Sequence, residues 1–268
     1  MTLAELTRLL SDCGIENSDV DARLLLSHFF SVSTASLLAD PQRDFASSAL
    51  EEAVARRRKR EPLQYILGKT DFYEERYELS PACLIPRFDT ELLVQEAIDT
   101  LPQGAHFADL GTGSGCIAIS VLAHRPDLSA VAVDISESAL ALAKQNAEKN
   151  GVSDRITFAH ADILTEKNAV PKDVGVILSN PPYITRDAMA SLAPELAFEP
   201  QTALFGGEDG LDFYRAILKN YPVPLYLFEI GFDQGDALRA LAKEYHLFAK
   251  ILRDLGGNDR LAVLSSEG

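Results

Sequence analysis

One stretch of the sequence decides the fold: His106-Phe107-Ala108-Asp109-Leu110-Gly111-Thr112-Gly113-Ser114-Gly115. Its apolar first half is typical of a buried strand, and its alternating glycines let the backbone turn sharply and approach a ligand without side-chain clash. The pattern Gly-x-Gly-x-Gly differs from the Gly-x-Gly-x-x-Gly of dinucleotide-binding folds, and the loop lacks the Lys-Ser/Thr of a phosphate-binding loop. Because Asp109 would repel a pyrophosphate, the loop favours a ligand that carries a cation or an amine.

Short apolar runs and helical patterns alternate beyond this stretch. The runs predicted as strands are 106–110, 130–133, 156–159, 174–178, 225–230, 247–252 and 261–264. Helical patterns separate most of the early runs, for example from Ser138 to Lys149. The alternation predicts an α/β fold with a mostly parallel, Rossmann-like sheet and helices on both faces. Such sheets bind ligands at the carboxyl ends of their strands.

The chain before the sheet has a different pattern. Residues 1 to about 70 look helical, with capping boxes expected at Thr2–Glu5 and Ser18–Asp21. The aromatic, partly alternating run Phe72–Leu79 predicts a hairpin. The expected parts are a helical N-terminal domain at 1–70, a hairpin connector at 71–86 and the domain that holds the sheet at 87–268.

The composition narrows the function classes. The chain has 25 Lys+Arg and 40 Asp+Glu, a net charge of −15, whereas a protein that binds by neutralising phosphates would be basic. Direct nucleic-acid binding is therefore not expected. The basic run Arg56–Arg60, at the end of a helix expected from about Ala46, is interpreted as a solvated helix end, with a partner-docking patch as the alternative.

The cysteines and the N-terminal segment indicate in which cellular compartment the protein is expected. Cys13, Cys83 and Cys116 give neither a disulfide framework nor a zinc knuckle, and no cluster of metal ligands is apparent. The segment Met1–Glu5 is too acidic for a signal peptide, and no apolar run is long enough to span a bilayer. We expect a cytoplasmic protein without a bound metal or a membrane partner.

Carboxylates follow the second and third strands of the predicted sheet. Asp134 ends the second, where a carboxylate can accept hydrogen bonds from both hydroxyls of a ribose; an acid at a helix N-terminus is the alternative. Asp162, past the third, could accept from an adenine amino group while Ile163 packs on the ring, although loop carboxylates are common. S-adenosylmethionine, which has a sulfonium and an amino group, would suit such a site.

The most informative motif is Ser179-Asn180-Pro181-Pro182-Tyr183, directly after the run 174–178. The prolines stiffen the backbone and remove two donors, so the side-chain oxygen of Asn180 and the carbonyl of Pro181 remain as acceptors. Two acceptors can hold both hydrogens of a planar –NH2 group, and the Tyr183 ring can pack on that group. Asn180 and Pro181 are the predicted catalytic residues; a plain turn is the alternative.

Asn-Pro-Pro-Tyr after a Gly-x-Gly-x-Gly loop resembles methyltransferases that modify planar amino nitrogens. Further stretches are similar to the HemK/PrmC family, and together they extend over nearly the whole chain. These stretches are 62–68, 84–91, 198–200, 203–212, 229–231 and 254–260. Arg87, Thr90 and Glu91 lie within them and are assigned no individual role.

The resemblance implies a peptide chain release factor glutamine methyltransferase. Such an enzyme transfers a methyl group from S-adenosylmethionine to the side-chain amide nitrogen of the glutamine in the Gly-Gly-Gln motif of class I release factors, leaving S-adenosylhomocysteine. Residues 1–70 would then recognise the substrate, and 87–268 would be the catalytic domain. The implied cofactor-binding residues are Asp109, Gly111, Thr112, Gly113, Ser114, Gly115, Asp134, Asp162, Ile163 and Asn180. The implied substrate-binding residues are Asn180, Pro181, Pro182 and Tyr183.

Three other functions stay open from the sequence alone. A ribosomal-protein glutamine methyltransferase would use the same catalytic motif on another protein. A nucleic-acid adenine methyltransferase shares the Asn-Pro-Pro-Tyr chemistry, but the acidic balance of the chain argues against it. In a non-catalytic nucleoside-binding module, Asn180 would merely shape a turn.

Overall fold

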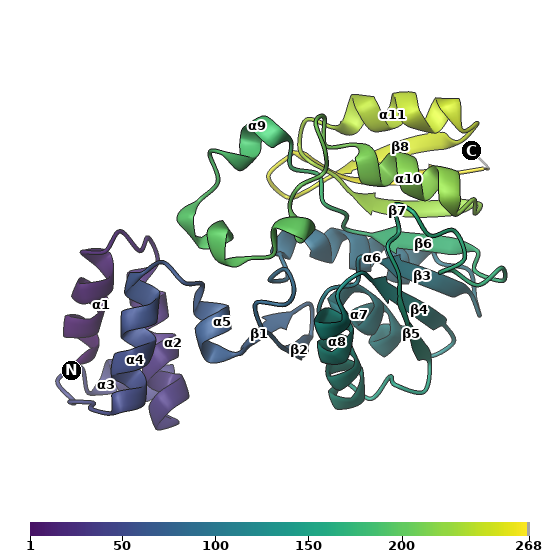
Figure 1. Cartoon of the computed structure of the whole chain (residues 1–268). Helices are drawn as coiled ribbons and strands as arrows, with labels where there is room; N and C mark the ends of the chain where they lie inside the picture. The colour runs from purple at the N-terminus through teal and green to yellow at the C-terminus, as the bar shows by residue number, and fades with distance from the viewer. Residues whose placement is uncertain (267–268) are drawn as a thin grey trace. The chain divides into compact units, whose positions relative to one another are not determined.

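The computed structural model describes residues 1–266, and the chain divides into two compact units (Figure 1). The helical unit comprises Met1–Lys69 together with Ala193–Phe198, and the sheet unit comprises Thr70–Leu192 together with the chain from Glu199 onward. The short segment 193–198 lies far from the helices in sequence, and its grouping with them was not anticipated. Across residues 1–266, no helix is long and apolar enough to span a bilayer.

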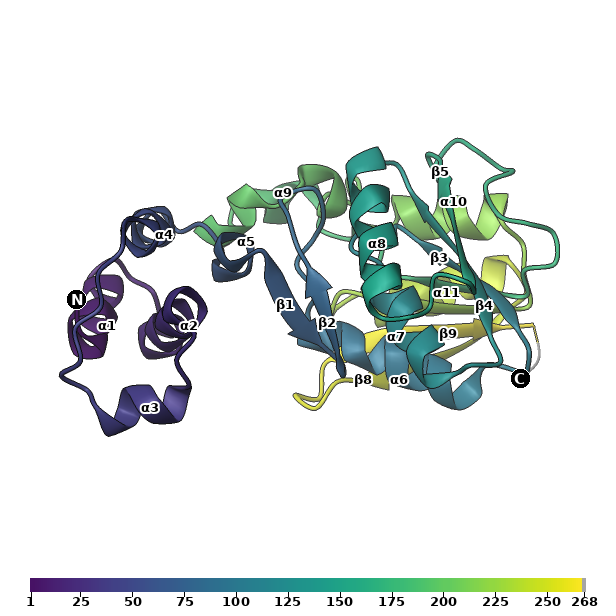
Figure 2. The same cartoon turned by 90° about the horizontal axis from the view of Figure 1, so that it is seen from below.

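The helical unit is built from short helices around a leucine-rich core. Its helices are α1 (Leu3–Ser11), α2 (Ser18–Phe30), α3 (Thr34–Ala39), α4 (Ser48–Arg58), α5 (Leu63–Leu67) and the 3-10 helix η2 (Pro194–Phe198). The helices α1, α2 and α4 pack against one another (Figures 1 and 2). Leu6, Leu10, Leu25 and Leu26 are fully buried between them.

One of the two predicted capping boxes is confirmed and the other is wrong. Thr2 and Glu5 form the reciprocal bonds that begin α1. Helix α2 begins at Ser18, but its N-cap is Asn17, which makes no side-chain cap bond. Asp21 does not reach back to the helix start because its carboxylate accepts from Arg57 Nε at 2.7 Å in the interior of the unit.

The basic run Arg56–Arg60 is neither a wholly solvated helix end nor a free patch. Arg57 is buried, where it pairs with Asp21 and lies 3.4 Å from the carboxylate of Glu195. Arg60 also donates to Glu195, at 3.0 Å. These ion pairs hold segment 193–198 within the helical unit, which explains why distant parts of the sequence form one body.

The sheet unit has the predicted α/β architecture. A hairpin of β1 (Lys69–Phe72) and β2 (Glu75–Glu78) precedes a seven-stranded sheet with the order β5-β4-β3-β6-β7-β9-β8. Strands β3 to β7 run parallel, and β9 lies antiparallel between β7 and β8. The strands of this sheet are β3 (His106–Leu110), β4 (Ser129–Asp134), β5 (Ile156–His160), β6 (Val176–Ser179), β7 (Leu225–Glu229), β8 (Phe248–Arg253) and β9 (Asp259–Ser265).

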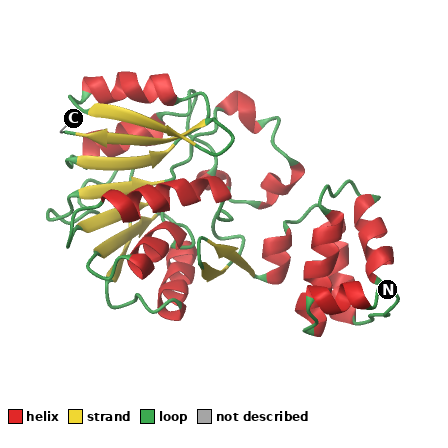
Figure 3. Cartoon of the chain, turned by 180° about the vertical axis from the view of Figure 1, so that it is seen from behind, coloured by secondary structure: helices red, strands yellow, loops and turns green. Residues whose placement is uncertain are grey.

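Helices cover both faces of the sheet (Figure 3). Successive strand residues point to opposite faces, and so Phe107 of β3 packs in one core while Ala108 packs in the other. The first core includes residues of α6 (Glu91–Thr100) and α7 (Cys116–His124), and the second includes residues of α10 (Asp212–Asn220) and α11 (Gly235–Glu244). Helix α8 (Glu137–Lys149) follows β4, and η1 (Phe88–Thr90), α9 (Arg186–Met189) and η3 (Gln201–Ala203) are short. This layering leaves the carboxyl ends of β3 to β7 to carry the site.

Candidate functional site

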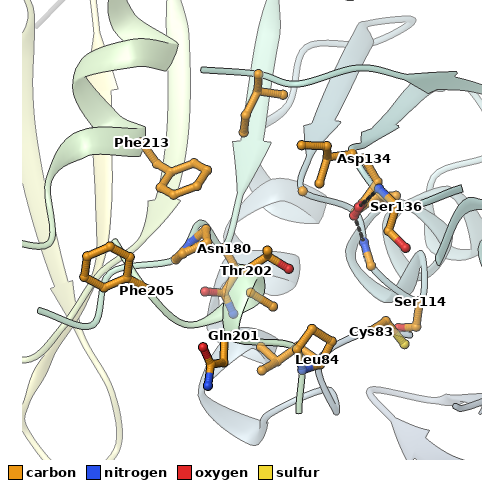
Figure 4. A pocket seen from close by; sticks show the side chains of 18 of the residues that line it. Cys83, Leu84, Ser114, Asp134, Ser136, Asn180, Gln201, Thr202, Phe205 and Phe213 are labelled. Carbon is orange, nitrogen blue, oxygen red and sulfur yellow. Dashed lines mark hydrogen bonds between the residues drawn. The ribbon is translucent and has the colours of Figure 1, made fainter. Parts of the chain in front are cut away.

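A cavity of about 680 Å³ lies within the sheet unit, beyond the carboxyl ends of its parallel strands. This volume is typical of a small-molecule site. The loops after β3, β4, β5 and β6 all contribute to its lining. Asn180 with Phe205 and Phe213 lies on one side of the cavity, and Asp134 with Ser136 lies on the other (Figure 4). The predicted site residues are therefore brought together from separate strands.

The glycine loop turns directly from β3 into α7. Gly111 and Gly113 have φ values of 74° and 56°, a region that side chains other than glycine rarely adopt. The main-chain N–H groups of Gly111 and Thr112 both donate to the carbonyl of Val133 at the end of β4, at 2.9 and 3.0 Å. Residues 111–114 line the cavity, whereas Gly115 lies at the start of α7 and does not.

Asp109 lies beneath this loop and not on the cavity wall. It is fully buried, and its Oδ2 accepts from Thr112 Oγ1 at 2.6 Å and from the N–H of Ala118 at 3.3 Å. Burial raises the pKa of Asp109 to about 7. Asp109, predicted to bind the cofactor, does not line the cavity; its carboxylate ties the loop to the first turn of α7.

Asp134 faces the cavity from the end of β4. Its Oδ2 accepts from the N–H of Gly113 at 2.8 Å and its Oδ1 from the N–H of Ser136 at 2.9 Å. Burial raises the pKa of this carboxyl, and the backbone N–H groups oppose that shift. Because a carboxylate oxygen has two lone pairs, both oxygens can still accept from a diol in the cavity.

Asp162 and Ile163 line the cavity on the loop after β5. The carboxylate of Asp162 organises a turn, since it accepts from the N–H of Leu164 and from Thr165 Oγ1, each at 2.9 Å. Ile163 is buried and presents an apolar surface. Asp162 and Ile163 together can support a flat ring, and Asp162 also has a structural role because it stabilises this turn.

The segment after β6 is anchored at its first residue. Ser179 Oγ donates to the carbonyl of Leu110 at 2.6 Å, which fixes the end of β6 against β3. Asn180 and Pro182 line the cavity. Pro181, which stands between them in the sequence, is buried and does not line it. The amide of Asn180 is thus presented to the cavity from a rigid backbone.

Tyr183 and two glycines reinforce the same segment. The ring predicted to pack on a substrate does not line the cavity; the Tyr183 hydroxyl donates to Glu229 Oε1 at 3.4 Å. A Cβ on Gly206 would lie 2.5 Å from the carbonyl oxygen of Pro182, and a Cβ on Gly210 would lie 2.3 Å from that of Tyr183. The glycines of stretch 203–212 therefore allow close backbone packing behind the Asn-Pro-Pro-Tyr motif.

Sequence reasoning missed the residues that support Asn180. Asn180 Nδ2 donates to Thr90 Oγ1 at 3.1 Å, and Thr90 Oγ1 donates to the buried carboxylate of Glu229 at 2.6 Å. In the same region, Arg87 pairs with the buried carboxylate of Glu199. These four supporting residues all fall in stretches that resemble the HemK/PrmC family, and this resemblance was the available signal in the sequence. Their pairing could not be predicted from it, because the pairs join distant segments of the chain.

Comparisons with known proteins show the family to which the chain belongs. Residues 2–68 match the family described as PrmC N-terminal domain, and residues 88–206 match the family described as methyltransferase small domain. A relative from Cereibacter sphaeroides, named release factor glutamine methyltransferase, is 42% identical and is aligned over 94% of this chain and 92% of its own length. The chain belongs to the release factor glutamine methyltransferase family. A second member, from Moorella thermoacetica, is 36% identical over 96% of this chain and 95% of its own length.

Solved structures outside the family share the fold. The Mtq2–Trm112 complex of E. cuniculi, described as methylating the eRF1 termination factor, contains a chain with a TM-score of 0.51 and 18% identity; 69% of this chain and 99% of that chain are covered. The hMettl16 catalytic domain, bound to a hairpin of the MAT2A 3′UTR, has a TM-score of 0.55 and 16% identity, with 83% of each chain covered. At these identities the likeness shows the fold alone.

The lining of the cavity in this family member suits hydroxyls and amines. Asp134 and Asp162 offer acceptors to the cavity, and Ile163 and Leu84 add apolar side chains to its lining. The two arginines in the lining, Arg87 and Arg186, are each paired with a glutamate, so the wall has little positive charge left for a phosphate. Within residues 1–266, no group of three or more His, Cys, Asp or Glu side chains that could hold a metal ion is found.

Proposed function

We propose that this chain transfers a methyl group from S-adenosylmethionine to the side-chain amide nitrogen of a release-factor glutamine. Two observations support the proposal: membership of the release factor glutamine methyltransferase family, and the Asn180 amide, which faces a cavity whose far side carries Asp134. The second supports the mechanism, because an oxygen that would accept from the glutamine amide then lies across the cavity from a carboxylate that would accept from the ribose. The substrate class implied by the resemblance is the Gly-Gly-Gln tip of class I release factors.

The residues around the glycine loop fit S-adenosylmethionine. Asp134 would accept from its ribose hydroxyls, and Asp162 with Ile163 would bind its adenine. The loop at 111–114 allows the backbone to approach its methionine part. When bound, S-adenosylmethionine supplies a strongly electrophilic methyl group.

The chemical difficulty is the weak nucleophile, because an amide nitrogen shares its lone pair with the carbonyl. We infer that Asn180 Oδ1, which faces the cavity, accepts one N–H bond of the glutamine. The main-chain carbonyl of Pro181, which lies between two residues of the cavity lining, accepts the other, and the two oxygens fix the nitrogen in line for attack. Alignment of this kind contributes roughly 7–11 kcal/mol in favourable systems. As the nitrogen gains positive charge, its bonds to these two oxygens strengthen, which stabilises the transition state. The proton leaves to water after the transfer.

The two alternative methyl acceptors are less well supported. A ribosomal-protein glutamine would fit the same two acceptors, but the relatives from Cereibacter sphaeroides and Moorella thermoacetica, which match over nearly the full length of both chains, are named for release factors. A nucleic acid would meet a chain of net charge −15. A release-factor substrate also places the reaction in the cytoplasm.

Methyl transfer from labelled S-adenosylmethionine tests the proposed function. The acceptors are a purified class I release factor, its variant with Gly-Gly-Ala in place of Gly-Gly-Gln, a ribosomal-protein mixture, tRNA and duplex DNA. We expect label on the unmodified release factor alone. The alanine variant lacks the carboxamide, tRNA and DNA would meet a chain of net charge −15, and the relatives are named for release factors, not for ribosomal proteins. Equal labelling of the alanine variant, or labelling only of another acceptor, would contradict the proposal.

The packing of Gly206 behind the motif gives a second expected result. In Gly206→Ala the new Cβ would lie 2.5 Å from the carbonyl oxygen of Pro182, so the Asn180–Tyr183 backbone must shift. A shift of this kind should lower turnover by about tenfold or more, while affinity for S-adenosylmethionine is retained. Steady-state kinetics and calorimetry measure the two effects.

A matched control is Gly175→Ala, on the turn before β6. A Cβ there meets no atom within 4 Å, so turnover should stay at the wild-type level. If Gly206→Ala were as active as Gly175→Ala, the rigidity of the Asn-Pro-Pro-Tyr segment would have no part in the reaction.

A further inference from the structure

A chain of hydrogen bonds connects the buried carboxylate of Glu229 to the amide of Asn180. Thr90 Oγ1 donates to Glu229 Oε2 at 2.6 Å, and Asn180 Nδ2 donates to Thr90 Oγ1 at 3.1 Å. Glu229 is the last residue of β7 and Thr90 is the last residue of η1. Each is only 2% exposed, so bulk water competes little for these bonds.

The direction of the protons along this chain fixes the amide. A threonine hydroxyl has one proton. Because Thr90 gives that proton to Glu229, its oxygen can only accept from Asn180, and the –NH2 group of Asn180 must face Thr90. A flipped amide would bring the Asn180 oxygen against a hydroxyl oxygen whose proton is already engaged. The Asn180 oxygen is thus directed away from Thr90.

We propose that Glu229 and Thr90 are positioning residues that hold the Asn180 amide with its oxygen toward the glutamine nitrogen. The inference rests on the proposed function. It matters because an amide flip would exchange an acceptor for a donor at one place. A donor there would oppose the N–H groups of the glutamine and leave its nitrogen misaligned.

The orientation depends on the charge of Glu229. As a carboxylate, Glu229 can only accept a hydrogen bond. Once protonated, it can donate to Thr90, whose own proton is then free to turn toward Asn180. That arrangement stabilises the flipped amide, so the protonated form should be the less active one.

The surroundings of Glu229 put this change near neutral pH. Burial raises the pKa of Glu229 to about 7, while the hydrogen bond from Thr90 opposes the shift. Arg260 lowers the pKa, Asp89 raises it, and the hydroxyl of Tyr183 donates to the carboxylate. Tyr214 is a further titratable neighbour, and its hydroxyl donates to the main-chain oxygen of Glu229 at 2.8 Å. Turnover is therefore expected to fall as the pH decreases through about 7.

The first test compares Thr90→Val with Thr90→Ser in the full chain, with a release factor as methyl acceptor. Valine keeps the shape but removes the hydroxyl, so kcat should fall by about tenfold, the rate equivalent of one lost hydrogen bond. Serine keeps the hydroxyl and should restore most of the rate. Calorimetric affinity for S-adenosylmethionine should be the same in both variants, which also shows that both are folded.

The second test is the pH profile of kcat, which a merely structural contact would not move. Wild type should lose turnover below about pH 7, and Glu229→Gln, which cannot titrate, should lack that limb. Asp109 also has a raised pKa of about 7. Its titration is left in place in Glu229→Gln, so an acid limb caused by Asp109 would persist in that variant. If the limb persisted in Glu229→Gln, or if Thr90→Val turned over like wild type, the inference would be contradicted. No transfer by wild type would instead contradict the proposed function, and the inference with it.

Discussion

Replacing Asn180 with alanine is expected to lower turnover by about a hundredfold or more, the scale of losing one preorganised polar group at a reacting atom. The loss should appear in kcat, because the Asn180 oxygen bonds most strongly to the nitrogen as that nitrogen becomes positive. Affinity for S-adenosylmethionine should largely survive, since Asp134 and the glycine loop lie on the other side of the cavity. Single-turnover kinetics with a release factor and calorimetry with the cofactor measure the two quantities.

Asn168→Ala is the matched control for this variant. Asn168 is exposed on the loop between β5 and β6 and does not line the cavity, so its loss should leave turnover unchanged. Near-normal turnover in Asn180→Ala would remove the catalytic role assigned to Asn180. A parallel loss of turnover and of cofactor affinity would show that Asn180 mainly serves binding.

Replacing Asp134 with alanine is expected to weaken binding of S-adenosylmethionine by about a hundredfold or more. Two hydrogen bonds from the ribose to a charged acceptor would be lost, each contributing about 1.5–3 kcal/mol. The N–H of Gly113, which now donates to Asp134 at 2.8 Å, would also lose its partner and loosen the loop. Calorimetric titration with S-adenosylmethionine and S-adenosylhomocysteine measures the dissociation constants.

The control for Asp134 is a surface aspartate before β5. Asp154 is exposed, so Asp154→Ala should bind the cofactor with wild-type affinity. At saturating S-adenosylmethionine, Asp134→Ala should recover much of its turnover, because Asp134 acts on the ground-state complex. An unchanged dissociation constant in Asp134→Ala would show that the ribose binds elsewhere in the cavity and not to Asp134.

The strands and the cavity-facing motifs could be predicted from the sequence because they depend on local chemistry. Parallel strands buried on both faces read as continuous apolar runs, and β3 begins and ends at the residues predicted, His106 and Leu110. The strand order then brings the ends of β3, β4 and β6 together, which places Asp134 and Asn180 around one cavity. The sequence therefore predicted that the loops after these strands would lie around one cavity.

The supporting contacts could not be predicted, because they join residues far apart in the chain. Thr90 and Glu229 are separated by 139 positions, and Asn180 and Thr90 by 90; no local pattern encodes such a pairing. Asp21 shows the same limit, since a buried arginine from α4 takes the carboxylate that a capping box would use. Asp109 was predicted to bind the ligand because of its charge; its full burial beneath the loop, where it accepts from Thr112 Oγ1, depends on packing that no local pattern encodes.

A crystal structure with S-adenosylhomocysteine and a Gly-Gly-Gln-containing release factor tests the central claim most directly. We expect the glutamine amide nitrogen to lie within about 2.7–3.2 Å of both Asn180 Oδ1 and the Pro181 carbonyl oxygen, with the cofactor sulfur on the opposite side of that nitrogen. A glutamine nitrogen beyond hydrogen-bond reach of Asn180, or an Asn180 amide turned with its –NH2 group toward the glutamine, would contradict the account.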